Sequence, residues 1–275
     1  MTYLQAVIYA IMWWSIPLSV VLLNVMLAVV HYAGPTGIML TWIPGRALML
    51  VLTLLHKPQL ADTLEYSWAA TLVPVIFLIT LHLGIRIMGQ QRLTRFACAA
   101  RRWGMYWTFA ILAMGAVVLL IGFVRDHGLY MGLGIAAILL NILNVVDAPQ
   151  HLEQDNIQLT YEYVLGVNIV ATGILVAIHA LVDQEELVWA GVLSNVPVFA
   201  IILMAAASLK PTPDAILTTG QHIYMMSYQI WPNMTFVGVL WGCLAHMSVA
   251  TAVGVAVGTT LGVLGIQYCM IKHIL

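Results

Sequence analysis

The stretch GIMLTWIPGRALMLVLTLLHKPQL (residues 37–60) decides the fold prediction, because its pattern recurs as AGVLSNVPVFAIILMAAASLKPTP at residues 190–213. Each copy passes from small residues through a hydroxyl side chain and a proline into an apolar run that ends at Lys-Pro. Aligned at a constant offset, the copies share the pairs Leu40/Leu193, Pro44/Pro197, Ala47/Ala200, Leu50/Leu203, Lys57/Lys210 and Pro58/Pro211. Leucines match by chance between any two apolar helices, but prolines and Lys-Pro pairs in register indicate a duplicated membrane arm.

Composition places the chain in a membrane class. Of 275 residues, 62% are hydrophobic and 8% are charged, and the mean hydropathy is +0.97. Soluble domains carry about 25% charged residues. Because hydrocarbon satisfies no backbone group, and the apolar runs have helical rather than strand length, we expect an all-α integral membrane protein in the lipid bilayer. A net charge of -1 gives no basis for binding nucleic acid.

The apolar runs predict about nine transmembrane helices, with a polar interval at residues 147–160. The predicted spans are residues 6–30, 36–55, 68–88, 106–124, 129–146, 161–182, 188–209, 223–246 and 249–271. They divide the chain into a first membrane repeat (1–126), a linking helix with a polar loop (127–160) and a second membrane repeat (161–275). With one linking helix between them, the two four-helix repeats are inverted relative to each other, as in many secondary transporters.

Arginines set the predicted orientation. Arg86, Arg92, Arg95, Arg101 and Arg102 surround the loop between the third and fourth spans, and short cytoplasmic loops collect Lys and Arg. This rule predicts a multi-pass protein of the cell inner (plasma) membrane with its amino terminus outside and its carboxy terminus cytoplasmic.

The second half resembles a known family. The similarity rests on AGVL at 190–193, VPVFAI at 196–201, YQIWP at 228–232, FVG at 236–238 and the closing IKH at 271–273. On these residues, the region from about 161 to 271 is similar to the GlpM-like family of small bacterial inner-membrane proteins, and the first half looks like a diverged duplicate. The resemblance implies an all-helical inner-membrane fold and carries no settled activity. This chain holds both halves in one polypeptide, unlike the shorter family members.

Arg46 follows Pro44 and Gly45 inside the second predicted span. Proline lacks an N–H and glycine loosens the helix, so unpaired carbonyls can gather beside a guanidinium at this break. A buried arginine at mid-membrane costs about 2.5 to 3.5 kcal/mol unless it is paired or faces a cavity. An anion site and snorkelling to the interface are both compatible with the pattern. We also expect breaks or kinks at Pro197 and Pro232.

Other polar residues in the spans are candidates for a solute site or for helix packing. Thr41, Ser194 and Asn195 lie just before the two in-register prolines, and His82 and His246 occupy matched places near the ends of two spans. Neutral imidazole suits a proton relay or a metal, but hydrogen bonding between helices is the commoner role. For Asn141 and for Asn168 with His179, we favour interhelical packing.

No cofactor or metal is predicted. Methionines near the eighth span, with His222 and His246, suggest Cu(I), but methionine is also an ordinary filler of apolar helices. The cysteines Cys98, Cys243 and Cys269 have no zinc-site spacing. No nucleophile elbow, P-loop, HExxH or carboxylate pair occurs, so we expect no enzyme.

The leading functional hypothesis is transport of a small polar or anionic solute by alternating access. Its expected site residues are Arg46, Thr41, Ser194, Asn195, His82 and His246, and its expected helix breaks are Pro44, Pro197 and Pro232. The rival hypothesis is a non-catalytic membrane subunit or scaffold that binds a second copy or a partner membrane subunit. A cavity at mid-membrane favours the transporter, whereas dense packing there and an exposed apolar face favour the scaffold.

Overall fold

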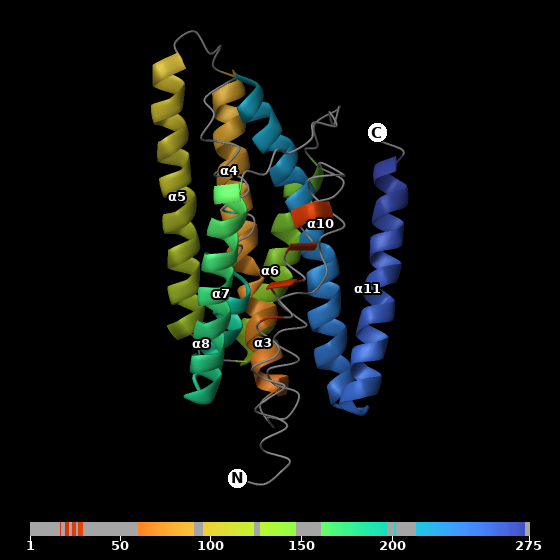
Figure 1. The fold of residues 1–275 in the computed structure, drawn as a ribbon. Coiled ribbons are helices and arrows are strands. Elements are labelled where there is room, and N and C mark those ends of the chain that lie inside the picture. Colours follow the sequence, from red (N-terminus) through yellow and green to blue (C-terminus); the bar gives the residue numbers. More distant parts are fainter. Residues whose placement is uncertain are drawn as a thin grey trace.

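The computed structural model describes residues 60–90, 96–123, 127–146, 161–196, 201 and 213–272, together with eight helical residues between Pro17 and Val29. Every regular element in these ranges is an α-helix (Figure 1). The helices are α3 (Leu60–Ala70), α4 (Leu72–Gln90), α5 (Phe96–Phe123), α6 (His127–Val146), α7 (Tyr161–Asp183), α8 (Leu187–Ser194), α10 (Pro213–Leu244) and α11 (Val249–Lys272). The prediction of an all-helical fold is confirmed for this part of the chain.

Four helical stretches are long and apolar enough to cross a membrane: Leu60–Ile87, Gly104–Phe123, Val164–Asp183 and Val249–Met270. The apolar part of α6, Gly128–Ile142, is shorter. These counts cover the described ranges only. Their length and composition are compatible with a helical multi-pass membrane protein.

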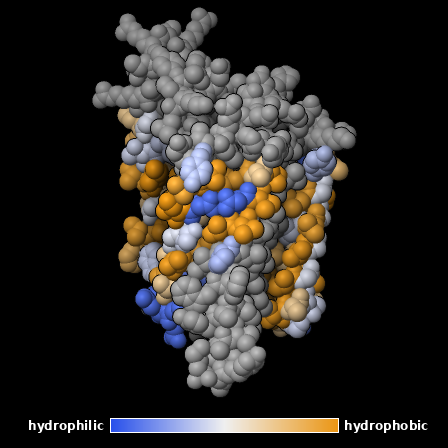
Figure 2. Space-filling view, viewed as in Figure 1, coloured by the Kyte–Doolittle hydropathy of each residue, from blue (hydrophilic) through white to orange (hydrophobic). Residues whose placement is uncertain are grey.

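The α3–α4 rod lies at the centre of the bundle. In the most apolar 18-residue stretch of this rod, 61% of the residues are buried. In the corresponding stretches of α5 and α7 the share is 11%, and in α11 it is 17%. The outer helices instead expose large apolar side chains, among them Phe109 at 60%, Leu112 at 62% and Phe123 at 80% on α5. Hydrophobic residues cover much of the described surface in Figure 2. In water such faces would be unfavourable, whereas lipid tails would solvate them.

The helix directions place several basic residues at one end of the bundle and several exposed carboxylates at the other (Figure 1). At the basic end, α4 finishes after the exposed Arg86, α5 begins with Arg101 and Arg102 near its start, and α11 finishes at Lys272. At the opposite, acidic end lie four exposed carboxylates. They are Asp62, Asp183, Glu185 and Glu186. Of these charges, the positive-inside rule counts only the Lys and Arg residues.

Aromatic side chains pack into glycine notches between helices. A Cβ at Gly84 on α4 would lie 2.6 Å from Cγ of Tyr106 on α5, and a Cβ at Gly238 on α10 would lie 2.8 Å from Cζ3 of Trp68 on α3. Small residues of this kind let apolar helices approach closely. Interhelical hydrogen bonding is also confirmed for Asn141 and Asn168. Asn141 donates to the Ser227 carbonyl of α10 at 2.9 Å. Asn168 and Asn24 exchange amide hydrogen bonds at 3.0 and 3.1 Å.

The spans differ from their predicted bounds where polar residues begin a helix. The third span starts at Leu60 rather than near residue 68. The prediction began too late because Asp62 and Glu65, in the first turns of α3, are not apolar. The eighth starts at Pro213 rather than near residue 223. The first two spans, apart from the eight residues named above, lie outside the described residues, as does most of the seventh. The count of nine and the inverted repeat therefore stay predictions.

Candidate functional site

The central rod is interrupted at Thr71. Pro74 lacks the N–H that would bond the Ala70 carbonyl, and its ring crowds that carbonyl, so a regular helix is disfavoured at this turn. The Thr71 N–H bonds the Trp68 carbonyl at 3.2 Å, three residues back instead of four. The Thr71 hydroxyl donates to the Ser67 carbonyl at 3.2 Å. The rod therefore consists of two helices, α3 and α4, joined by one tight turn.

A second helix ends beside this turn. The helix α8 finishes at Ser194, and the next two backbone N–H groups, of Asn195 and Val196, bond carbonyls three residues back at 3.0 and 3.2 Å. Pro197 follows in the sequence, and a residue before proline is disfavoured in helical conformation. Helix α8 therefore ends just before Pro197, and because Pro197 lies outside the described residues, the helix break expected there stays a prediction.

The Asn195 side chain connects the end of α8 to α3. Its Nδ2 lies 2.8 Å from the Ser67 hydroxyl and 3.1 Å from the Ser67 carbonyl on α3. The same nitrogen lies 3.0 Å from the Gly191 carbonyl and 3.2 Å from the Ser194 hydroxyl of its own helix. An amide has two protons, so four acceptors share them. We call the set Ser67, Thr71, Gly191, Ser194 and Asn195 the helix-break junction.

The junction is tightly closed. Its four polar side chains are buried, with exposed fractions between 0% and 5%. A Cβ at Gly191 would lie 2.8 Å from Cβ of Tyr66 and 3.1 Å from the Ser67 nitrogen, so only glycine allows α8 to approach α3 this closely. The junction is chemically neutral: hydroxyl, amide and backbone groups suit a hydrogen-bonding ligand.

In α10 one backbone hydrogen bond is missing at a proline, and a neighbouring helix supplies the donor instead. The helix α10 continues through Pro232, so Pro232 does not end it as expected, and the size of any bend there stays a prediction. Pro232 offers no N–H to the Tyr228 carbonyl one turn back. Gln267 of α11 donates its Nε2 to that carbonyl at 3.1 Å. A neighbouring helix thereby replaces the missing backbone bond.

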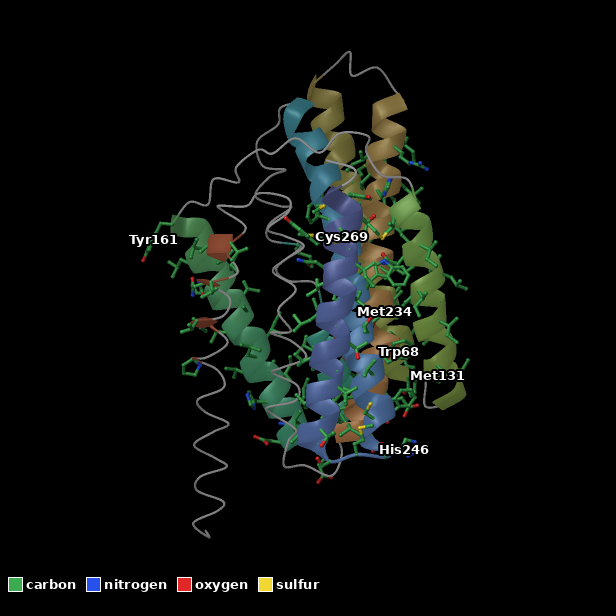
Figure 3. The ribbon with its side chains drawn as sticks, turned by 90° about the vertical axis from the view of Figure 1, so that its right-hand side faces the viewer. Trp68, Met131, Tyr161, Met234, His246 and Cys269 are labelled. Atoms are coloured by element: carbon green, nitrogen blue, oxygen red, sulfur yellow. The ribbon has the colours of Figure 1, made fainter. Side chains whose placement is uncertain are left out.

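The predicted site residues are not all brought together. Ser194 and Asn195 lie in the junction. Half-buried His82 belongs to α4, and His246 is exposed between α10 and α11. Figure 3 shows His246 at the end of the molecule, away from Trp68. Arg46, Thr41 and Pro44 lie outside the described residues.

Three important residues were absent from the sequence-based site. Ser67 and Thr71 complete the junction, and Glu65, on the same helix, is 6% exposed. The signal that could have found them is Pro74, which interrupts an apolar run one turn after two hydroxyl residues at helical spacing. Glu65 was missed because the span was expected to begin after it.

Comparison with known protein families, with curated proteins and with solved structures gave no match for this chain. The resemblance to the GlpM-like family therefore stays a prediction.

Proposed function

We propose that this protein is a multi-pass transporter of the cell inner membrane that moves a small polar or anionic solute by alternating access. The observation that carries the proposal is the helix-break junction. One helical rod is interrupted at Thr71, helix α8 ends beside this turn, and Asn195 joins the two within an apolar bundle. Interrupted helices are the usual site of solute and ion binding in secondary transporters, because freed carbonyls and side chains line the site.

The proposed cycle makes the junction a gate as well as a site. In the closed state the Asn195 amide occupies the groups that a solute would bind, namely the Ser67 hydroxyl and carbonyl. Separation of α8 from α3 would release these groups to a hydroxyl- or amide-bearing solute. The anionic option rests on Arg46 in the predicted second span. The Lys and Arg residues at the basic end support a cytoplasmic position for that end.

A second function, a non-catalytic membrane subunit or scaffold, is favoured by a different observation. The junction is densely packed, and α5, α7 and α11 present broad apolar faces. A second copy or a partner membrane subunit could cover such a face. The two functions predict opposite outcomes in a flux measurement.

Uptake into proteoliposomes tests the proposal. The probes are radiolabelled glycerol, serine, lactate and inorganic phosphate, which sample neutral, zwitterionic and anionic solutes. Wild-type protein is expected to take up at least one probe faster than protein-free liposomes, and Asn195→Leu to lose that uptake because the bridging amide is gone. Asn168→Leu is the matched control, since it removes an interhelical amide away from the junction. Uptake of no probe, or equal uptake by wild type and Asn195→Leu, contradicts the proposal.

A further inference from the structure

Four oxygen atoms of described residues surround the side-chain nitrogen of Asn195 in the helix-break junction. The Ser67 hydroxyl and carbonyl lie 2.8 and 3.1 Å from Nδ2, and the Gly191 carbonyl and Ser194 hydroxyl lie 3.0 and 3.2 Å from it. Hydrogen bonds from N–H groups to oxygen span about 2.7 to 3.2 Å. Because carbonyl oxygens only accept hydrogen bonds, Nδ2 and not Oδ1 of Asn195 must face them. This point in the junction therefore suits a hydrogen-bond donor.

Both carbonyls at this point have lost their regular backbone donor. In a continuous helix the Thr71 N–H would bond the Ser67 carbonyl, but it bonds a carbonyl three residues back instead. The Asn195 N–H likewise bonds a carbonyl three residues back and not that of Gly191. One hydroxyl donates to each freed carbonyl, Thr71 to Ser67 at 3.2 Å and Ser194 to Gly191 at 2.7 Å. The remaining capacity of both carbonyls is directed at the Asn195 nitrogen.

The electrostatics of the junction favour a positive ligand over a negative one. Ser67 and Gly191 belong to the last four residues of α3 and α8, where the carbonyls without a helical donor carry partial negative charge. An anion at the position of the Asn195 nitrogen would face these carbonyl oxygens and be repelled. Divalent metal ions bind six or more oxygens at about 2.0 to 2.6 Å, usually with carboxylates among them. The junction residues include no carboxylate, and their oxygens lie at N–H bonding distances.

We infer that the position of Asn195 Nδ2 is the binding point for the protonated primary amine of a solute, an inference that rests on the proposed transport function. In the closed state the Asn195 amide occupies this point. When that side chain withdraws, an ammonium group donates to the same four oxygens. A carboxamide brings two protons to four acceptors, whereas an alkylammonium brings three and ammonium itself brings four. Hydrogen bonds from a charged donor are also about twice as strong as those between neutral groups.

Competition in proteoliposomes tests this ligand class with the full-length wild-type protein. The probe is radiolabelled methylammonium at about pH 6, where nearly all of it is protonated because alkylamines titrate near about pH 10. Protein-free liposomes correct for diffusion of the neutral amine. We expect uptake above this background, its loss in excess ammonium, and no effect of lactate, phosphate, K⁺ or tetramethylammonium at the same concentration. Tetramethylammonium carries the same charge but no N–H group, so it separates hydrogen bonding from charge.

A second measurement requires no transport. Asn195→Ala leaves the four oxygens without their common donor, so it should lower the melting temperature of the protein in detergent. Methylammonium is smaller than the deleted carboxamide and should raise this temperature in a saturable manner, whereas tetramethylammonium should not. Asn168→Ala, which removes an interhelical amide away from the junction, is the control that methylammonium should not stabilise.

The outcomes separate this inference from the proposed function. A wild type that takes up no probe of any class contradicts transport itself. Uptake of glycerol, lactate or phosphate without uptake of methylammonium overturns the ligand class and leaves transport standing. Competition by K⁺ or tetramethylammonium as strong as that by ammonium overturns it as well, even if no variant folds. Stabilisation of Asn195→Ala by both methylammonium and tetramethylammonium, or by neither, has the same consequence.

Discussion

The repair of α10 by Gln267 leads to a prediction about two residues on different helices. In the wild type the Tyr228 carbonyl lacks a backbone donor because residue 232 is proline, and the Gln267 amide supplies one at 3.1 Å. In Pro232→Ala the new N–H of residue 232 can bond the same carbonyl. The two substitutions should therefore be energetically coupled, since Pro232→Ala removes the need for Gln267.

The magnitude follows from the groups involved. Leaving a buried carbonyl unpaired costs about 1 to 3 kcal/mol, whereas interhelical hydrogen bonds in a membrane average about 0.6 and reach about 1.7 kcal/mol. Gln267→Leu also removes Oε1 of Gln267, a buried acceptor with no hydrogen-bond partner in the described structure, which offsets part of the cost. The effect of Gln267→Leu alone can therefore be small, so the decisive quantity is the coupling free energy between Gln267→Leu and Pro232→Ala. We expect this coupling free energy to be about 0.5 to 1.7 kcal/mol.

A double-mutant cycle measures this coupling. The free energy of unfolding is obtained in mixed micelles, by circular dichroism at rising fractions of denaturing detergent, for the wild type, both single variants and the double variant. Gln267→Leu should destabilise the wild type and should cost nothing, or stabilise, in the Pro232→Ala background.

Asn141→Leu is the matched control. Asn141 bonds the Ser227 carbonyl, whose regular helical donor is Trp231 and not the proline. Its effect should add to that of Pro232→Ala within about 0.5 kcal/mol. If Gln267→Leu is equally additive, the account of α10 is refuted.

Three further predictions concern other sites. Gly191→Ala should destabilise the protein by about 1 to 3 kcal/mol, because its Cβ meets Tyr66 and Ser67, whereas Gly173→Ala on the exposed face of α7 should not; an unfolding free energy unchanged at Gly191 would contradict this. Glu185 has a φ of 62°, so Glu185→Gly should stabilise the protein by up to about 1 kcal/mol in the same assay, and a loss of stability would count against strain there. If Arg46 binds an anion, Arg46→Lys should weaken uptake of a planar carboxylate such as lactate, and equal flux from wild type, Arg46→Lys and Arg46→Ala would end that role.

The sequence predicted the helices whose apolar runs are uninterrupted. The bounds of α6, α7 and α11 differ from their predicted ones by no more than two residues, because each run is bordered by polar residues. The centre of the bundle was predicted less well. The acidic residues Asp62 and Glu65 placed the predicted start of the span after them, whereas α3 begins before both, with Asp62 exposed and Glu65 buried.

The candidate site was predicted in part for a similar reason. Asn195 was found because it precedes a proline at a duplicated position. Pro74 could have pointed to the turn near Ser67, but no local pattern reveals that α8 packs beside α3 at this level. Pro232 was expected to interrupt or kink its helix, and the sequence could not show that Gln267, on another helix, would supply the missing donor.

The proposed transport cycle requires the helix-break junction to open to both sides of the membrane. Ser67→Cys, in a background without Cys98, Cys243 and Cys269, tests this with a membrane-impermeant thiol reagent added to one side at a time. Ser67 is 3% exposed in the closed state, so modification requires opening. Ala69→Cys, buried in an apolar cluster of the same helix, is the control that should stay unmodified. Alternating access predicts slow modification of Ser67→Cys from both sides. Protection from both sides under every condition in which the protein is folded would contradict transport and favour the scaffold.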